Sequence, residues 1–398
     1  MNSSIAAGFL EGQLEYLQNR GFEVTLLCPK RRNDEWEVQR PDGISVLEVP
    51  MERKISPLKD IASLWRLWKA IRTIRPKVTN VGTPKAGLLG GFAAWLNRVP
   101  GRFYTLHGLR FETTTGLRRW LLIRAERLAC SFAHRVVCVS RSVREKAIAC
   151  GLTTRERSVV FGSGSCNGVN ISRFAPSPKL MRRAAEVRKE LGIPLRSTVI
   201  MFMGRLTCDK GIPELVHAFS LLDSQYPHLR LLLVGCLEEE DPLPADILRK
   251  LKTHPRVVFA GAVQDTPAYY AAADIVVLPS RREGLPTAVL EAQASCKPVV
   301  AASATGIVDI VEDGETGLLF PVGDVPGLCE SLEELITNRD LADRLGRAGM
   351  EQVERDFRQE RIWKALYQEY MKVLGENGAA VPSPSLTAKN KLIPRSTD

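Results

Sequence analysis

The stretch TVIMFMGRLTCDKGIPELVHAFSLL, residues 198–222, decides the fold. Residues 198–203 form a continuous apolar run, which predicts a strand buried on both faces. Residues 212–222 carry apolar side chains at helical spacing, and Pro213 suits the first turn of a helix. The loop between them holds two cations, Arg205 and Lys210. Since open parallel sheets bind ligands beyond the carboxyl ends of their strands, we expect this loop to face a ligand.

The same alternation of strand and helix continues on both sides of this stretch. In the second half we expect strands at 229–234, 257–259, 274–279 and 298–301, and helices at 245–251, 267–273 and 286–294. In the first half we expect helices at 9–18, 61–74, 117–129 and 142–150, and strands at 24–28, 101–106 and 136–139. Apolar strands that alternate with helices indicate parallel sheets covered on both faces. The chain is therefore predicted to be an α/β protein with two doubly wound units.

The order of these elements predicts the organisation of the chain. Residues 1–175 are expected to form an N-terminal unit, and residues 176–358 a C-terminal unit. A doubly wound unit usually opens with a strand and a glycine-rich turn, and the first nine residues show neither, so the first strand is expected to be missing or very short. Residues 359–374 predict a helix that crosses back to the N-terminal unit. Residues 375–398 are rich in Pro, Ser, Gly and Ala, which predicts a disordered tail.

The composition excludes several classes of protein. With 398 residues, 44% of them hydrophobic and 25% charged, the chain is not disordered as a whole. Its longest uncharged apolar stretch, residues 86–96, is shorter than the ~20 residues that span a bilayer. The nine cysteines include no C-x-x-C pair, which argues against a zinc site. Their odd number and the lack of a secretory signal predict reduced thiols and a cytoplasmic location.

The positive charge is concentrated in the first part of the chain. The net charge is +10, yet residues 1–180 hold 29 basic and 14 acidic side chains, and the remainder holds 26 and 31. A basic unit would suit an anionic membrane or a phosphate-bearing substrate. The candidates for membrane or acceptor contact are Lys85, the group Arg118, Arg119 and Trp120, and the helix that carries Lys59, Arg66, Lys69 and Arg72 with Trp65 and Trp68. The alternative is that such helices pack their tryptophans on a sheet and leave their charges in solvent. No aromatic–basic interleaving points to nucleic acid.

A second segment with candidate functional residues is EGLPTAVLE, residues 283–291, which also follows a predicted strand. Gly284 permits a tight turn, and Pro286 suits the start of a helix. The free N–H groups near Thr287 would then point at an anion. The carboxylates of Glu283 and Glu291 could accept paired sugar hydroxyls. Alternatively, Glu291 is an ordinary surface residue of the helix, Glu283 is a charge near the helix start, and the cations of the first loop are simply solvated.

Together these motifs resemble the family 4 retaining glycosyltransferases of GT-B fold, in which two Rossmann-like domains face each other across a cleft. The resemblance rests on G-R-L-x-x-x-K-G at 204–211 and E-G-L-P-x-x-x-L-E at 283–291, and it spans about residues 5–372. In the first half, TPKAGLLG at 83–90, YTLHG at 104–108, GSGS at 162–165 and NGV at 167–169 resemble a subgroup that builds capsular, exopolysaccharide and lipopolysaccharide chains.

The resemblance implies a role for each matching residue. Arg205 and Lys210 would neutralise the donor pyrophosphate, and Glu291 would bind the ribose hydroxyls. The donor sugar would be held by Glu283, with the amides of Gly284 and Leu285, and by His107. Thr287 is a further donor-binding candidate because of the free N–H groups at the helix start described above. The backbone near Val263 would read the base. The expected donor is a nucleotide sugar, with UDP favoured, and no metal or other cofactor is expected.

The resemblance also implies a lipid-linked or polysaccharide acceptor and a peripheral position at the inner face of the cell membrane. Two alternatives stay open. A sugar-nucleotide epimerase of the same fold would need further acid and base side chains in the cleft. A catalytically impaired paralogue that only binds nucleotide would fit the missing first strand, but it does not fit a chain that contains His107, Arg205, Lys210, Glu283 and Glu291.

Overall fold

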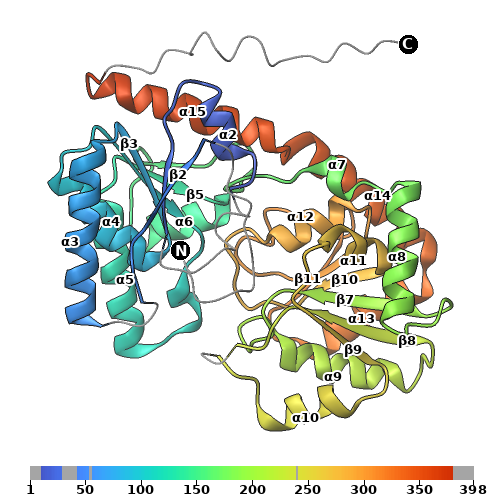
Figure 1. The fold of residues 1–398 in the computed structure, drawn as a ribbon. Coiled ribbons are helices and arrows are strands. Elements are labelled where there is room, and N and C mark those ends of the chain that lie inside the picture. Colours follow the sequence, from blue (N-terminus) through green and yellow to red (C-terminus); the bar gives the residue numbers. More distant parts are fainter. Residues whose placement is uncertain (1–9, 29–42, 53–55, 239–240, 380–398) are drawn as a thin grey trace, which may run out of the picture.

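The computed structural model describes residues 10–28, 43–52, 56–238 and 241–379. It contains a four-stranded and a six-stranded sheet, each parallel throughout, which confirms the predicted α/β fold. Figure 1 shows the two sheets side by side, each with its own helices. The expected absence of a first strand concerns residues 1–9, and most of the expected disordered tail concerns residues 380–398. Both segments lie outside the described ranges.

The N-terminal sheet has the order β3-β4-β5-β6, formed by Val78–Gly82, Gly101–Leu106, Arg135–Cys138 and Ser158–Val159. A separate parallel pair joins β1 (Thr25–Cys28) to β2 (Ser45–Glu48). The helices that accompany these strands are α2 (Gln13–Gln18), α3 (Pro57–Ile74), α4 (Pro84–Leu96), η1 (Arg110–Thr113), α5 (Gly116–Ser131) and α6 (Arg141–Ala149). Helix α4 contacts both α3 and α5, so these three helices form one layer.

The C-terminal sheet has the order β12-β11-β10-β7-β8-β9, formed by Leu318–Phe320, Val299–Ala302, Ile275–Leu278, Thr198–Met203, Leu229–Val234 and Val257–Gly261. The predicted strands at 198–203 and 229–234 are confirmed to the residue. From β7 the chain moves outward to β9 and then returns to β10 on the other side of β7. The strand order therefore reverses between β7 and β10, where a doubly wound sheet leaves a crevice for ligands.

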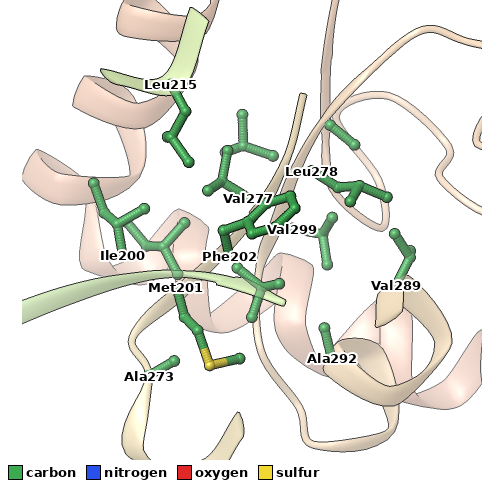
Figure 2. Packing of buried hydrophobic residues seen from close by; sticks show 14 of the residues in the cluster. Ile200, Met201, Phe202, Leu215, Ala273, Val277, Leu278, Val289, Ala292 and Val299 are labelled. Carbon is green, nitrogen blue, oxygen red and sulfur yellow. The ribbon is translucent and has the colours of Figure 1, made fainter. Parts of the chain in front are cut away.

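Helices cover this sheet and close its core. They are α8 (Pro178–Glu190), α9 (Ile212–Asp223), α10 (Ala245–Thr253), α11 (Thr266–Ala272), α12 (Thr287–Ala294), α13 (Val325–Thr337) and α14 (Arg339–Asp356), with the short α7 (Ile171–Phe174) before them. Figure 2 shows Ile200, Met201 and Phe202 of β7 packed between neighbouring strands and helices. These three side chains are fully buried, and burial of each contributes about 1.5–3 kcal/mol to the free energy of folding. The core fixes β7, and with it the loop that follows.

The last helix, α15 (Gln359–Glu376), packs on the N-terminal sheet. Its Ile362, Leu366 and Tyr370 share an apolar cluster with Phe103 of β4. The Tyr370 hydroxyl accepts a hydrogen bond of 2.8 Å from the side-chain amide of Asn80 in β3. Because α14 before it packs against α12, the end of the chain links the two sheets.

Candidate active site

Two strand-to-helix loops meet at the point where the strand order reverses. One is the loop 204–211 between β7 and α9, and the other is the loop 279–286 between β10 and α12. Gly211 has a left-handed backbone (φ +72°), and a Cβ there would lie 2.1 Å from the Pro279 carbonyl oxygen. Only glycine therefore allows the two loops this close approach.

Charged side chains join these two loops. The Lys210 ammonium pairs with the Glu283 carboxylate, and solvent reaches little of either side chain (19% and 11%). The Arg281 amide donates a 2.9 Å hydrogen bond to the Asp209 carbonyl, and the Arg282 guanidinium lies 2.5 Å from the Asp209 carboxylate. The structure thus places the cation at 210 beside the 283–287 turn. Arg281 and Arg282 were not singled out from the sequence, although they directly precede Glu283.

Arg205 occupies a different part of the crevice edge. Its guanidinium pairs with the Glu238 carboxylate at 2.8 Å, and about half of its side chain is exposed. Glu238 belongs to the loop after β8, and the neighbouring Leu237 forms a backbone bridge with Leu206. Arg205 and Lys210 therefore follow the same strand but have different partners in the structure.

The N-terminal unit contributes His107, which follows β4. A Cβ on Gly284 would lie 1.9 Å from the His107 carbonyl oxygen, so the backbones of the two units touch at this point. His107 is an exposed residue, yet desolvation by the surrounding protein lowers the pKa of its imidazole to about 4. The imidazole is consequently neutral between pH 5 and 8, where it can accept one hydrogen bond and donate another.

Glu291 lies on α12, just over one turn from the start of the helix. Burial raises the pKa of Glu291 to about 7, although the nearby Tyr270 hydroxyl and the Arg173 cation act in the opposite direction. Its carboxyl group is therefore about half ionised at neutral pH.

The remaining predicted donor residues lie along the same edge. Thr287 is the first residue of α12, so free backbone N–H groups are available there. The side chain of Leu285 lies against the loop at Gly164, and Val263, just after β9, packs partly against the core. Within the described ranges, no group of three or more His, Cys, Asp or Glu side chains is arranged to hold a metal ion.

Further polar contacts hold the two units together beside the crevice. The backbone N–H of Ser142, in the first turn of α6, donates to Asp309 at 3.1 Å, and its hydroxyl bonds the same carboxylate. Thr305 donates to Glu112 at 2.7 Å, and Glu112 also pairs with Lys146. Sequence reasoning did not find these residues, because nothing in a single sequence shows which polar side chains meet across two units.

Comparison with known proteins agrees with this geometry. The family model described as "Glycosyl transferases group 1" matches residues 184–352, and the model described as "Glycosyl transferase 4-like domain" matches residues 7–164. The capsular polysaccharide biosynthesis glycosyltransferase CapM of Staphylococcus aureus is 32% identical over 92% of this chain and 94% of its own length. A UDP-Gal:alpha-D-GlcNAc-diphosphoundecaprenol alpha-1,3-galactosyltransferase of Escherichia coli is 27% identical over 83% of this chain and 84% of its own.

Solved structures share the fold. Anabaena Alr3699/HepE in complex with UDP-glucose superposes with a TM-score of 0.71 at 24% identity, over 84% of this chain and 86% of that one. Sucrose-phosphate synthase from Thermosynechococcus elongatus gives a TM-score of 0.77 at 22% identity, over 93% and 94% of the two chains. The CapM match and the two family models confirm the resemblance that the motifs carried. The chain therefore belongs to the group 1 glycosyl transferases and is a glycosyltransferase of GT-B fold.

Proposed function

We propose that this glycosyltransferase moves a sugar, with retention of configuration, from a UDP-sugar to a lipid-linked or polysaccharide acceptor in the synthesis of a cell-surface polysaccharide. One observation carries the proposal: the Lys210–Glu283 pair lies at the strand-order reversal, directly beside the contact between His107 and Gly284. The named substrates of the Escherichia coli relative, a UDP-sugar and a lipid diphosphate, support the same substrate classes.

The ion pair supplies the groups that the donor needs. When the donor binds, Lys210 would turn to the diphosphate and Glu283 to a sugar hydroxyl, so each charge exchanges one partner for another. As the bond to the sugar breaks, negative charge grows on the leaving diphosphate. A cation and the free N–H groups at the start of α12 stabilise that charge more in the transition state than in the ground state. The neutral imidazole of His107 would orient a second sugar hydroxyl.

A direct test uses the purified full chain with a panel of nucleotide sugars and a membrane lipid extract. The proposal predicts that sugar from a UDP donor is incorporated into the lipid fraction. A changed sugar in the absence of acceptor would instead identify an epimerase. Nucleotide binding without either product would identify a catalytically impaired paralogue.

Binding of UDP should strengthen as the pH rises from 6 to 8. Glu291 has its pKa raised from 4.5 to about 7, so it is mostly protonated at pH 6 and mostly ionised at pH 8. Only the ionised carboxylate accepts both ribose hydroxyls, which predicts about tenfold tighter binding at pH 8, measurable by titration calorimetry. Glu291→Gln should flatten this pH dependence. Since the titration of the UDP diphosphate affects both proteins equally, the difference between wild type and variant isolates the contribution of Glu291. An equally steep pH dependence in Glu291→Gln would remove Glu291 from the ribose site.

The same shift predicts the sign of an effect on stability. The folded state disfavours the ionised form of Glu291, because the pKa is about 7 in the folded chain and 4.5 as a reference. Glu291 therefore does not lower the free energy of unfolding below pH 4.5, and it lowers that free energy progressively as the pH rises towards 7 and above. Without ligand, Glu291→Gln should therefore raise the melting temperature relative to the wild type at pH 8 but not at pH 5.

We also propose that the layer α3, α4 and α5 docks on an anionic membrane at the inner face of the cell membrane. The layer exposes three tryptophans: Trp65 (58%), Trp95 (48%) and Trp120 (52%). Its helices hold nine basic and two acidic residues. The two acids are Asp60, which pairs with Lys85, and Glu126, which is buried. The exposed surface is thus basic and aromatic, as an interfacial surface requires.

The membrane candidates named from the sequence differ in their exposure to solvent. Arg118, Arg119 and Trp120 are all exposed on α5. Trp68 packs against the apolar cluster beneath α3, in line with the alternative that these helices bury their tryptophans. Trp65 is exposed instead. Lys85 is largely covered, because it pairs with Asp60 and donates to the Glu52 carbonyl at 2.7 Å. In the part of the chain that the structure describes, no helix combines the length and hydropathy needed to cross a bilayer.

Vesicle flotation tests this surface. The wild type should bind vesicles that contain phosphatidylglycerol, bind neutral phosphatidylcholine vesicles weakly, and release from the former as salt rises. Trp65→Ser with Trp120→Ser should weaken binding at least about tenfold. The matched control is Leu195→Ser, which removes an 82% exposed leucine from the C-terminal unit and should bind as the wild type does. Equal binding by the double variant would overturn the assignment.

A further inference from the structure

We propose that Arg282 is a positioning residue that couples the contact between the two units to the loop 204–211, which carries Lys210. The inference rests on the proposed function, because the proposed function makes the loop 204–211 a donor-binding loop. Arg282 lies between Arg281 and Glu283 in the loop after β10. None of the motifs that carry the family resemblance contains it.

One guanidinium makes both of the contacts that the coupling requires. Its Nη2 lies 2.5 Å from the Asp209 carboxylate, in the loop that holds Lys210. Its Nε donates a 3.0 Å hydrogen bond to the Thr113 hydroxyl, at the end of η1 in the N-terminal unit. A guanidinium is a rigid plane, so the two bonds fix Asp209 and Thr113 relative to each other.

The other side-chain hydrogen bonds between the units described above do not reach the loop 204–211. Two groups of side chains join α6 and η1 to the segment 303–309. They are the pair Ser142 and Asp309, and the group Glu112, Lys146 and Thr305. Among the hydrogen-bonding side chains of the described ranges, Arg282 is the one that touches both the loop 204–211 and the N-terminal unit. Separation of the units would therefore release Asp209, the neighbour of Lys210, through this side chain.

Arg281 provides a matched comparison. Its guanidinium pairs with Glu214 in the first turn of α9, so both partners lie within the C-terminal unit. The two arginines are neighbours in one loop and each has a carboxylate partner. They differ in two contacts: Arg282 bonds Thr113 in the other unit, and its carboxylate partner, Asp209, lies in the loop 204–211 rather than in α9. Effects that Arg282→Gln shows and Arg281→Gln does not can thus be assigned to these two contacts, and Thr113→Val then isolates the contact between units.

Hydrogen exchange of the full chain, without substrate, tests the coupling. Amides in the segment 206–211 are held by turn bonds such as Lys210 N–H to the Thr207 carbonyl. Thr113→Val removes only the hydroxyl in the other unit, and it should speed exchange in this segment several-fold. In an Arg282→Gln background the same substitution should have no further effect there. If Thr113→Val changes exchange only near η1, the coupling is absent.

Kinetics supply the second measurement. Arg282→Gln should lower kcat for transfer about 10- to 100-fold, while UDP affinity stays within about threefold, because Arg282 orients the loop without touching the donor. Arg282→Lys keeps a charge for Asp209 and should recover the melting temperature but little of kcat. Arg281→Gln should lower the melting temperature with kcat close to that of the wild type. Equal losses of kcat in Arg281→Gln and Arg282→Gln would overturn the proposal.

A failure of the proposed function would look different. If the wild type transfers sugar from no donor in the panel, the substrate assignment falls, yet the exchange measurement still decides whether Arg282 links the units. If the wild type transfers sugar and Thr113→Val leaves both exchange and kcat unchanged, only the role of Arg282 falls.

Discussion

Lys210→Met should lower kcat for sugar transfer by about 100-fold or more, and Glu283→Gln should do the same. Lys210 pairs with Glu283 in the loop that leads into α12, where the proposal puts the leaving diphosphate. Removing one preorganised group of this kind typically costs about 10²–10³ in kcat. Glu283→Gln keeps the shape of the side chain but removes the charge that fixes the lysine and accepts sugar hydroxyls. Steady-state transfer from the donor identified in the panel measures both losses.

The double variant separates catalysis from stability. Each single substitution leaves a largely buried charge without its partner, which should cost roughly 1–3 kcal/mol of unfolding free energy. Lys210→Met with Glu283→Gln removes both charges, so most of that loss should be recovered while activity stays absent. Differential scanning calorimetry and the transfer assay on the same preparations test this. A stable double variant that still transfers sugar would exclude both residues from the mechanism.

Arg188→Met is the matched control for these variants. Arg188 pairs with Asp274 at 2.8 Å, at the opposite end of β10 from the crevice. Its removal should reduce the melting temperature by a similar amount and leave kcat unchanged. A comparable loss of kcat in Arg188→Met would mean that the effect of Lys210→Met is a consequence of lower stability.

The elements that the sequence predicted well are those whose pattern has a single interpretation. Strands β7 (TVIMFM) and β8 (LRLLLV) are mostly apolar runs, each followed by a glycine, and they are found where expected. The pair β3 and α4 was not predicted. Strand β3 reads VTNVG, with a polar residue in its centre, and α4 contains three glycines and no polar face. Gly87 of α4 is needed because a Cβ there would lie 2.3 Å from the Tyr104 ring, a contact that no periodicity shows.

Helix α8 was not predicted either, because it has too few apolar residues rather than too few polar ones. Most of its residues are charged or polar, and only Ala184 and Val187 are buried, against α11. Two small buried residues give too weak an apolar stripe for a sequence pattern. Tertiary packing, and a Ser177 side chain that caps the first turn, decide this helix instead.

For the site, the sequence identified the groups but not their partners. It placed Arg205 and Lys210 together because they share a loop. The structure pairs Lys210 with Glu283, 73 residues away, and Arg205 with Glu238. Those partners depend on β10 and β8 lying on opposite sides of β7, which is a property of strand order. A single sequence predicts which loops carry chemistry, whereas the order of the strands decides which charges meet.

Gly284→Ala should reduce transfer by about 100-fold or more by preventing the two units from meeting. The new Cβ would lie 1.9 Å from the His107 carbonyl oxygen and 3.0 Å from a methyl group of Val139. Backbone atoms cannot give way as a flexible side chain does, so the units must separate at this point. A misplacement of about 1 Å between reacting groups can cost about 10² in rate. Small-angle scattering should show a larger radius of gyration for the variant, and the transfer assay should show the lost rate.

Gly375→Ala is the control for this substitution. Gly375 lies near the end of α15, where an added Cβ would meet no atom within 4 Å, so alanine should raise stability by up to about 1 kcal/mol and leave transfer unchanged. UDP affinity separates two causes in Gly284→Ala: separation of the units spares a nucleotide site built by the C-terminal unit, whereas local damage to the loop weakens it. Wild-type scattering together with wild-type kcat in Gly284→Ala would show that transfer does not require the contact between His107 and Gly284, and the arrangement of the two units proposed for the reaction would then be wrong.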